Sequence, residues 1–414
     1  MGEPIAVTAG MNTSESIPRL TLRPKRDRRV KSGHPWVFSN ELEPGFADVD
    51  PGAVVDVFDA SGAFVGRGMA SPNSLIAVRI CSRLRKQDLD SPLFFEERLR
   101  RALHFRKVVW PDRRDLRLVN AEGDELPGLI IDRYGDTLAV QINTVGMEVR
   151  KEALQTALQN VLGPTTTDGL SAVLRNDNRV RTLEGLEQGS GPWFGDVPEH
   201  ADIVEHGVTF RVQLLGGQKT GHFYDQADNR AFAGRLCRGR RVLDMYANSG
   251  GFALQALVQG AEHAIAVDKS APNAAISTAN AELNGVADRF EAVTAEGNRN
   301  LEVRVQQGER YGAVVLDPPA FAKTKKAAGN ALRGYERINT LGMMLVEPDG
   351  FLITHSCSFH VFEDRFLEML GRAAKAAGRT LRLVRRGEQA PDHPVLPGVP
   401  ETRYLKSLAL QVGL

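Results

Sequence analysis

The second half of the chain alternates strand-like and helix-like segments, and this alternation constrains the fold more than any other feature. From about residue 200 onwards the apolar runs RRVLDMYA, HAIAVDK, FEAVTA, YGAVVLD and GFLITHS have the character of buried strands, and helical stretches separate most of them. The pattern predicts a doubly wound, mainly parallel α/β sheet. The ending, with TLRLVRR and RYLKSLALQV, adds two more strands, and an antiparallel edge is expected there. In such sheets the chemistry lies at the carboxyl ends of the strands.

A chain of 414 residues is too long for one ordinary core, so several domains are expected. Residues 19–85 carry short strands with glycine turns, as in VVDVFD-ASG-AFVGRGMA, which is typical of a small β-barrel. Residues 86–200 begin with an amphipathic helix, SPLFFEERLRRALHFRKVV, with a capping serine and a first-turn proline, and continue as an α+β domain. Residues 201–414 are predicted to form the doubly wound domain, and residues 1–18 a flexible N-terminus.

Composition excludes several classes of protein. Hydrophobic residues at 42% and charged residues at 25% describe a globular chain, and no run approaches the roughly 20 apolar residues of a bilayer span. The start, MGEPIAVTAGMNTSES, lacks the basic flank and apolar core of a signal peptide. Three widely spaced cysteines provide neither a disulfide framework nor a four-ligand zinc site. We therefore expect a cytoplasmic protein with no membrane partner and no metal.

One segment is strongly basic although the net charge of the whole chain is only +1. RLTLRPKRDRRVK carries seven basic residues against one acid, and SGHPWVFSNEL follows it directly. A lone basic run is more often a solvated face, and a tryptophan in a small barrel is more often core. Side by side, basic and aromatic groups suit phosphate contacts with base stacking. The predicted RNA-binding residues are Arg23, Lys25, Arg26, Arg28, Arg29, Lys31, His34 and Trp36.

Acids and glycines follow the first three strands of the predicted sheet. Asp244 and a glycine turn lie between the first strand and its helix, Asp268 ends the second strand, and Glu296 follows the third. Glycines allow close backbone approach to a ligand, and an acid after the second strand can accept hydrogen bonds from ribose hydroxyls. A dehydrogenase would share that acid but requires the G-x-G-x-x-G fingerprint, which is absent. This constellation resembles that of class I S-adenosylmethionine-dependent methyltransferases. The resemblance implies S-adenosylmethionine as cofactor, with the predicted contacts Asp244, Tyr246, Ala247, Asn248, Ser249, Gly250, Gly251, Asp268, Lys269, Glu296, Gly297, Asp317 and Pro318.

The fourth and fifth strands end in VVLDPPAF and THSCSFH. The prolines stiffen the loop after Asp317, although any D-P-P is also compatible with a simple prolyl turn. Adjacent strands should place Cys357 opposite Asp317. Carbon 5 of a pyrimidine is a poor nucleophile, so its methylation requires a thiolate that adds to carbon 6, an acid near ring nitrogen N3 and a base for the carbon-5 proton. Cys357 and Asp317 are the predicted catalytic residues, and the sequence does not identify the base.

Most lone cysteines are inert and buried. The polar neighbours of Cys357 argue against inert burial, because Ser356, Ser358, His355 and His360 can stabilise a thiolate. Cys81 in AVRICS and Cys237 in AGRLCRGRR have no such neighbourhood and are interpreted as structural.

The sequence resembles the bacterial ribosomal large-subunit RNA cytosine-5 methyltransferases over about residues 20 to 414. The resemblance rests on GHPWVF, RLVNAEGDELPGLIIDRYGD, GGQKTGHFYDQADNR, LDPPAF, RGYERIN and SCSFHV. It implies a PUA domain for RNA, a central α+β domain and a Rossmann-like methyltransferase domain, with Cys357 as nucleophile and Asp317 as the D-P-P acid. It also implies that the segment from Lys219 to Gln226 lines the cofactor pocket, with Phe223 and Gln226 as candidate contacts. A homodimer is implied as well.

Three positions depart from the family pattern. Asn248 stands where an aromatic is common, Glu296 where aspartate is usual, and His355 where a small residue, cysteine or aromatic is frequent. The first two changes preserve the chemistry, and the sequence offers no physical reason for His355.

The sequence thus predicts methylation of cytosine carbon 5 in 23S ribosomal RNA, with S-adenosylmethionine as cofactor. One alternative is methylation of a purine nitrogen through D-P-P with a structural Cys357. Another is a non-catalytic RNA-binding assembly factor, which the intact set of acids and Cys357 disfavours. The sequence identifies neither the modified nucleotide nor whether naked RNA or an assembly intermediate is the substrate.

Overall fold

The structure, a computed structural model, describes residues 17–167, 169–215, 220–322 and 324–414. Most of the predicted flexible N-terminus, residues 1–16, lies outside them, and so does Lys219. The chain divides into two compact units. The first comprises the described residues within Met1–Ala201, Gln213–Gly221 and Pro391–Thr402, and the second those within Asp202–Val212, His222–Ala390 and Arg403–Leu414.

The first unit begins with a five-stranded sheet in the order β1-β3-β4-β5-β2. The predicted hairpin forms as β3 and β4, which pair antiparallel. Alternate apolar side chains of these strands, such as Val37, Val55 and Val78, are fully buried in a core of their own. The strands are β1 (Arg19–Thr21), β2 (Trp36–Phe38), β3 (Val54–Phe58), β4 (Phe64–Ala70) and β5 (Ile76–Ser82), and the short helix α1 (Arg28–Lys31) lies within the basic run.

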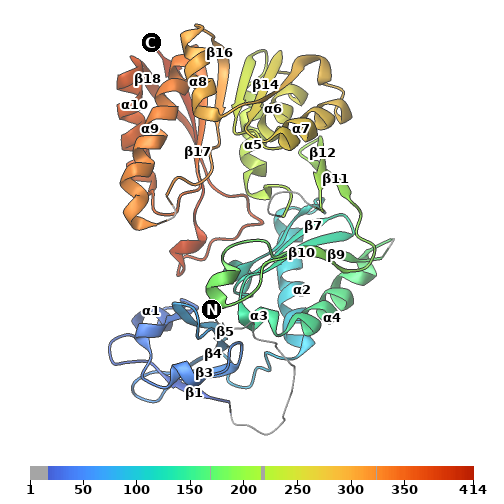
Figure 1. The fold of residues 1–414 in the computed structure, drawn as a ribbon, viewed down its shortest axis with the longest axis vertical. Coiled ribbons are helices and arrows are strands. Elements are labelled where there is room, and N and C mark those ends of the chain that lie inside the picture. Colours follow the sequence, from blue (N-terminus) through green and yellow to red (C-terminus); the bar gives the residue numbers. More distant parts are fainter. Residues whose placement is uncertain (1–16, 168, 216–219, 323) are drawn as a thin grey trace. The chain divides into compact units, whose positions relative to one another are not determined.

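A second sheet of the same unit has the order β10-β9-β8-β7-β6. Helices α2 (Pro92–Val109) and α4 (Lys151–Leu162) pack side by side against it (Figure 1). As predicted, Ser91 caps α2 by accepting a hydrogen bond from the Leu93 N–H at 3.3 Å. The strands are β6 (Leu116–Asn120), β7 (Leu129–Tyr134), β8 (Thr137–Ile142), β9 (Ser171–Arg175) and β10 (Ser190–Phe194), and the short helix α3 (Val145–Glu148) precedes α4.

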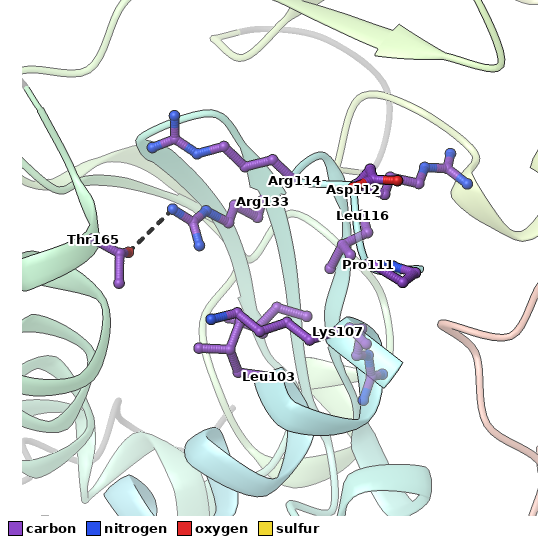
Figure 2. Close-up of a pocket in the computed structure, with 11 residues that line it drawn as sticks. Leu103, Lys107, Pro111, Asp112, Arg114, Leu116, Arg133 and Thr165 are labelled. Atoms are coloured by element: carbon purple, nitrogen blue, oxygen red, sulfur yellow. Dashed lines mark hydrogen bonds between the residues drawn. The ribbon is translucent and has the colours of Figure 1, made fainter. Parts of the chain in front are cut away.

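A cavity of about 250 Å³ opens between α2, β6 and the loop that joins them (Figure 2). Three of the five basic residues that line the cavity have partners within the first unit. Arg106 is paired with Asp124, Arg114 is paired with Asp136, and Arg133 donates to Thr165. Part of the cavity wall is therefore formed by residues that make ion pairs inside the first unit. Its basic lining residues are Arg106, Lys107, Arg113, Arg114 and Arg133.

The second unit contains the predicted doubly wound sheet, with seven strands in the order β15-β14-β13-β16-β17-β19-β18. Neighbouring strands run parallel except β19, which is antiparallel to both β17 and β18. The strands are β13 (Arg241–Met245), β14 (His263–Asp268), β15 (Phe290–Thr294), β16 (Tyr311–Leu316), β17 (Val346–Ser356), β18 (Thr380–Gly387) and β19 (Lys406–Gly413). The order reverses between β13 and β16, which is where ligands bind in open α/β sheets.

Helices cover both faces of this sheet, as its buried strands require. One face carries α5 (Ala227–Leu236), α6 (Gly251–Val258) and α7 (Ala271–Leu283), and the other carries α8 (Gly297–Gln306), α9 (Ala328–Leu345) and α10 (Glu363–Ala377) (Figure 1). A separate two-stranded sheet, β11 (His200–Glu205) with β12 (Val208–Gln213), precedes them. The predicted α/β fold class is thereby confirmed. No helix in the described ranges is long and apolar enough to cross a membrane.

Candidate active site

The turn after β13 has an unusual backbone that local hydrogen bonds hold in place. Tyr246, Asn248 and Gly250 adopt positive φ angles of 65°, 49° and 78°. The Asn248 N–H donates to Asp268 Oδ2 at 3.0 Å, and Ser277 Oγ donates to the Asn248 carbonyl at 2.9 Å. Left-handed backbone at non-glycine residues is uncommon and concentrates at ligand sites. The structure therefore brings together the predicted acid of the second strand and the predicted loop of the first.

Asp244 lies fully buried beneath this turn. Its Oδ2 accepts a hydrogen bond from the Ala253 N–H at 3.0 Å, whereas Oδ1 has no hydrogen-bond partner in the described part of the chain. Burial, reinforced by the charge of Asp317, raises the pKa of Asp244 to about 8, although the Ala253 N–H acts in the opposite direction. A cation bound beside Asp244 would offset these effects and favour its ionised form. S-adenosylmethionine carries positive charge at its sulfonium and ammonium groups, so the site fits it.

The third predicted acid lies at the start of α8. Glu296 is exposed and caps this helix by accepting a hydrogen bond from the Arg299 N–H at 2.8 Å. The Tyr246 hydroxyl donates to Asn298 Oδ1 at 3.1 Å, so its ring lies over the first turn of α8. A Cβ at Gly297 would lie 2.5 Å from that ring, and only glycine fits there. Lys269, also predicted as a contact, is exposed beyond the end of β14.

Asp317, the D-P-P acid, follows β16 and is held by Gln226, which directly precedes α5. Gln226 Nε2 donates to Asp317 Oδ2 at 3.1 Å. Asn229 Nδ2 in turn donates to Gln226 Oε1 at 2.7 Å, which orients the amide. Two of the predicted residues, Gln226 and Asp317, are thus in direct contact. Pro318 is buried beside them in the chain, and Phe223 is half-buried.

Cys357 follows β17, the strand that pairs in parallel with β16. The register sets Leu316 opposite Thr354, so Cys357 lies about two residues, or roughly 7 Å along the strand direction, beyond the level of Asp317. Ser358 links the two loops, because its Oγ accepts a hydrogen bond from the Ala322 N–H at 3.1 Å. The Tyr335 hydroxyl also lies 3.0 Å from Ser358 Oγ. The segments that follow D-P-P and S-C are therefore tied together.

The three cysteines differ in their surroundings. Cys357 is half-exposed, whereas Cys81 and Cys237 are buried at 5% and 1% exposure. Burial raises the pKa of both Cys81 and Cys237 to about 12, so neither thiol ionises near neutral pH. Among the three, Cys357 is the one placed to react.

His355 is fully buried and stacks on Phe252 of α6 with ring centroids 4.9 Å apart. Burial lowers its pKa to about 3, and neither ring nitrogen has a hydrogen-bond partner within the described ranges. The imidazole is therefore neutral at physiological pH and cannot supply positive charge to a thiolate. Its structural contribution is a flat ring against Phe252.

His355→Phe is expected to change the free energy of unfolding by no more than about 1 kcal/mol, because it removes two unpaired buried nitrogens while keeping the ring contact. Urea denaturation of the purified protein measures this change. A loss of about 3 kcal/mol or more would show that the nitrogens have partners in solution.

The sequence interpretation missed a buried charged cluster beside the glycine turn. At the end of β11, Glu205 Oε1 accepts a hydrogen bond from Arg230 Nε and Oε2 accepts one from Arg230 Nη2, each at 2.7 Å. His222 Nε2 also lies 3.0 Å from Oε2. Burial acts to raise the pKa of Glu205, but Arg230 and His222 hold it well below its usual range. A Cβ at Gly251 would lie 2.8 Å from Arg230 Cδ, so the cluster packs directly against the start of α6.

The predicted RNA-binding residues divide into two groups. His34 is buried and its Nε2 lies 3.2 Å from Glu401 Oε2. The Trp36 indole N–H donates to Glu122 Oε1 at 2.8 Å, and Arg29 forms an ion pair with Glu41 at 3.2 Å. These three side chains have structural partners within the first unit. The exposed group consists of Arg23, Lys25, Arg26, Arg28 and Lys31.

Comparison with known proteins relates both units to described families. Residues 20–83 match a family of PUA-like domains, and residues 100–410 match a family of S-adenosylmethionine-dependent methyltransferases. The ribosomal RNA large subunit methyltransferase I of Klebsiella pneumoniae (strain 342) is 36% identical over 97% of this chain and 100% of its own length. That of Salmonella arizonae is 35% identical over 97% of this chain and 99% of its own length.

Solved structures share the fold. A chain assigned as a methyltransferase and complexed with SAH superposes with a TM-score of 0.81 at 19% identity, over 95% of this chain and 100% of that chain. A Streptococcus mutans chain assigned as a SAM-dependent methyltransferase gives a TM-score of 0.80 at 18% identity, with the same coverage. The family match over residues 100–410 covers the segments with the predicted cofactor turn, D-P-P and Cys357. The chain belongs to the ribosomal RNA large subunit methyltransferase I family, in which a PUA-like domain precedes an S-adenosylmethionine-dependent methyltransferase.

Proposed function

We propose that the protein methylates carbon 5 of a cytosine in 23S ribosomal RNA, through a covalent adduct with Cys357. The substrate class is that named in the curated relatives. The observation that carries the choice of carbon 5 is the placement of the half-exposed Cys357 and of Asp317 after adjacent parallel strands, with their loops joined through Ser358.

The site provides two of the groups that the reaction needs, a nucleophile and an acid. The Cys357 thiolate adds to carbon 6 of the ring, while Asp317, in its carboxylic-acid form, donates a proton to ring nitrogen N3, so that the negative charge is neutralised and an enamine forms. The adduct makes carbon 5 nucleophilic. S-adenosylmethionine supplies the electrophilic methyl group when bound. A base then removes the carbon-5 proton, the thiolate leaves carbon 6, N3 returns its proton to Asp317, and the aromatic ring is restored.

The amide of Gln226 holds Asp317 in place through its hydrogen bond to Oδ2. Gln226 is 3% exposed and accepts a hydrogen bond from Asn229, so the side chain of Asp317 has a fixed orientation. The cytosine must leave its stack to reach these groups, and a structured RNA with a locally open site is therefore the expected substrate.

Mapping of 5-methylcytosine tests the proposal. Bisulfite sequencing of ribosomal RNA from a deletion strain should show the loss of one methylated cytosine, and the wild-type gene should restore it. Unchanged cytosine methylation, together with loss of a methylated purine, would favour transfer to nitrogen through D-P-P. No change in any RNA methylation would favour an assembly factor.

RNA binding through the basic run gives a separate prediction. Arg26 and Arg28 are exposed, and no carboxylate of the described residues lies within ion-pair distance of either. The double change Arg26→Ala with Arg28→Ala should weaken RNA binding and lower the slope of log affinity against log salt by about two, one for each phosphate contact. Fluorescence anisotropy over a salt series measures both quantities.

A matched control removes two exposed positive charges from the second unit, as Lys375→Ala with Arg382→Ala. Equal slopes for the wild type and for the variant with Arg26→Ala and Arg28→Ala would mean that the basic run is a solvated face that does not contact RNA. We also propose a homodimer, as the family resemblance implies, and sedimentation at micromolar concentration would reveal a monomer if this is wrong.

A further inference from the structure

Lys406 is a buried lysine beside the proposed nucleophile. It begins β19, opposite Ser356 of β17, and is 8% exposed. Its Nζ donates to the Ser358 carbonyl at 2.7 Å and to the Tyr404 carbonyl at 2.8 Å. Across the described ranges, no carboxylate lies within ion-pair distance of Nζ. The ammonium is thus compensated by two peptide dipoles and by no fixed anion, which is a costly arrangement for a structural lysine.

The charged groups around Lys406 act on its pKa, and the Cys357 thiolate is the first of them. Burial lowers the pKa of Lys406 to about 8, and the Cys357 thiolate opposes that decrease. Such an interaction is mutual, so a thiolate that favours the ammonium is itself favoured by the ammonium. Arg403 lowers and Glu363 raises the same pKa more weakly. Glu363 is already paired with Arg386 at 2.9 Å, which leaves Cys357 as the anion available to Lys406.

Other groups near Cys357 do not provide this charge. Tyr335, from α9, interacts electrostatically with Cys357, but burial raises the pKa of its phenol, so it stays neutral. The His355 imidazole is neutral as well, because burial lowers its pKa to about 3. Lys406 is a cation that interacts with the Cys357 thiolate, and its Nζ lies 2.7 Å from the carbonyl of the next residue, Ser358.

We propose that Lys406 is a positioning residue that keeps Cys357 in the thiolate form and fixes the S-C-S loop through its two carbonyl contacts. The inference rests on the proposed function, because it assigns a purpose to the Cys357 nucleophile. Sequence inspection did not suggest it, since Lys406 is 48 residues from Ser358 along the chain.

Alkylation of Cys357 tests the inference without any RNA. Iodoacetamide reacts with thiolates, and the burial of Cys81 and Cys237 confines the reaction in the folded protein to Cys357. In the wild type, the rate of alkylation against pH should have its midpoint below the value of about 8.5 of an ordinary thiol. Lys406→Met should move that midpoint up by about one unit and slow alkylation at pH 7 about tenfold.

Three further variants serve as controls, and a fourth replaces Lys406→Met if that variant does not fold. Lys406→Arg keeps the charge and should restore most of the wild-type profile. Arg382→Met removes an exposed positive charge from β18, in the same sheet, and should leave the profile unchanged. Cys357→Ser supplies the background. If Lys406→Met does not fold, Lys406→Gln retains an N–H donor for the carbonyls without the charge and should show the same upward shift.

The inference is wrong if the profile of folded Lys406→Met or Lys406→Gln coincides with that of the wild type, or if the wild-type midpoint lies at or above about 8.5. A folded Lys406→Arg variant that behaves like Lys406→Met would also overturn it, because charge would then not be the cause. Failure of the proposed function is distinguishable. Full methylation by Cys357→Ala would remove the covalent mechanism, whereas the alkylation profiles would still report the effect of Lys406 on the thiol.

Discussion

Cys357→Ala is expected to lower the rate of methyl transfer to ribosomal RNA by at least about a thousand-fold, while S-adenosylmethionine binding stays at the wild-type level. The reason is chemical. Without a covalent adduct at carbon 6, carbon 5 of cytosine lacks the electron density to attack a methyl group, and no other half-exposed thiol exists among the three cysteines. Single-turnover transfer of a radiolabelled methyl group measures the rate, and calorimetry measures cofactor binding.

Cys237→Ala is the matched control, because Cys237 lies in the same unit, is 1% exposed and has a pKa raised by burial to about 12. It should retain the wild-type rate at temperatures where it is folded. RNA that carries 5-fluorocytosine provides a second readout, since a carbon-5 fluorine cannot leave as a proton and the adduct persists. Wild-type protein should form a denaturation-resistant complex with it and Cys357→Ala should not. Full methylation by Cys357→Ala would instead support transfer to a nitrogen through D-P-P.

Glu205→Gln is expected to lower the free energy of unfolding by about 3–5 kcal/mol, because it leaves the Arg230 guanidinium buried without its anion. The size of the side chain is preserved, so the loss reports charge and not a cavity. Urea denaturation at pH 7 measures the change. Cofactor affinity should decrease as well, since Arg230 packs against Gly251 at the start of α6.

The neighbouring Asp202→Asn is the control for this experiment. Asp202 lies on the same strand, and its carboxylate pairs with Arg211 at 2.8 Å, but that pair is exposed. Its removal should leave the unfolding midpoint within experimental error. A Glu205→Gln variant as stable as Asp202→Asn would contradict a stabilising role for the cluster.

The buried pair of Glu205 and Arg230 also predicts a pH dependence of the free energy of unfolding. The pKa of Glu205 is held well below its usual value in the folded protein, so folding favours its ionised form. The stabilisation is fully present above pH 4.5, the ordinary value of a glutamate, and is lost as the pH falls through the lower folded value. Wild-type protein should therefore lose more stability on acidification below pH 4.5 than Glu205→Gln does.

Features that depend on local pattern could be predicted from the sequence. The strand ends bearing Asp244, Asp268, Asp317 and Cys357 lie on consecutive or adjacent strands of one sheet, and apolar runs with polar ends are enough to reveal them. The Ser91 cap is equally local. These features follow from the hydrogen-bonding needs of strands and helix ends, which act over a few residues.

Features that depend on tertiary contacts were not accessible. Glu205 and Arg230 are 25 residues apart, and Lys406 meets Ser358 because β19 inserts between β17 and β18. The basic run was also only partly interpretable. Counting charges does not reveal that Arg29 is paired with Glu41 and that Lys31 lies 2.7 Å from Asp59. Pairing of this kind reduces the charge available to RNA.

The position of β19 sets the order in which the protein acquires activity during its synthesis. This strand is not at the edge of the seven-stranded sheet, although Lys406–Gly413 follow every other strand of that sheet in the sequence. Until those residues have been synthesised, β17 lacks its antiparallel neighbour and the Cys357 loop lacks the lysine that contacts Ser358. A nascent chain therefore completes this part of the sheet, and its thiol gains the proposed activating contact, only after Lys406–Gly413 have been synthesised.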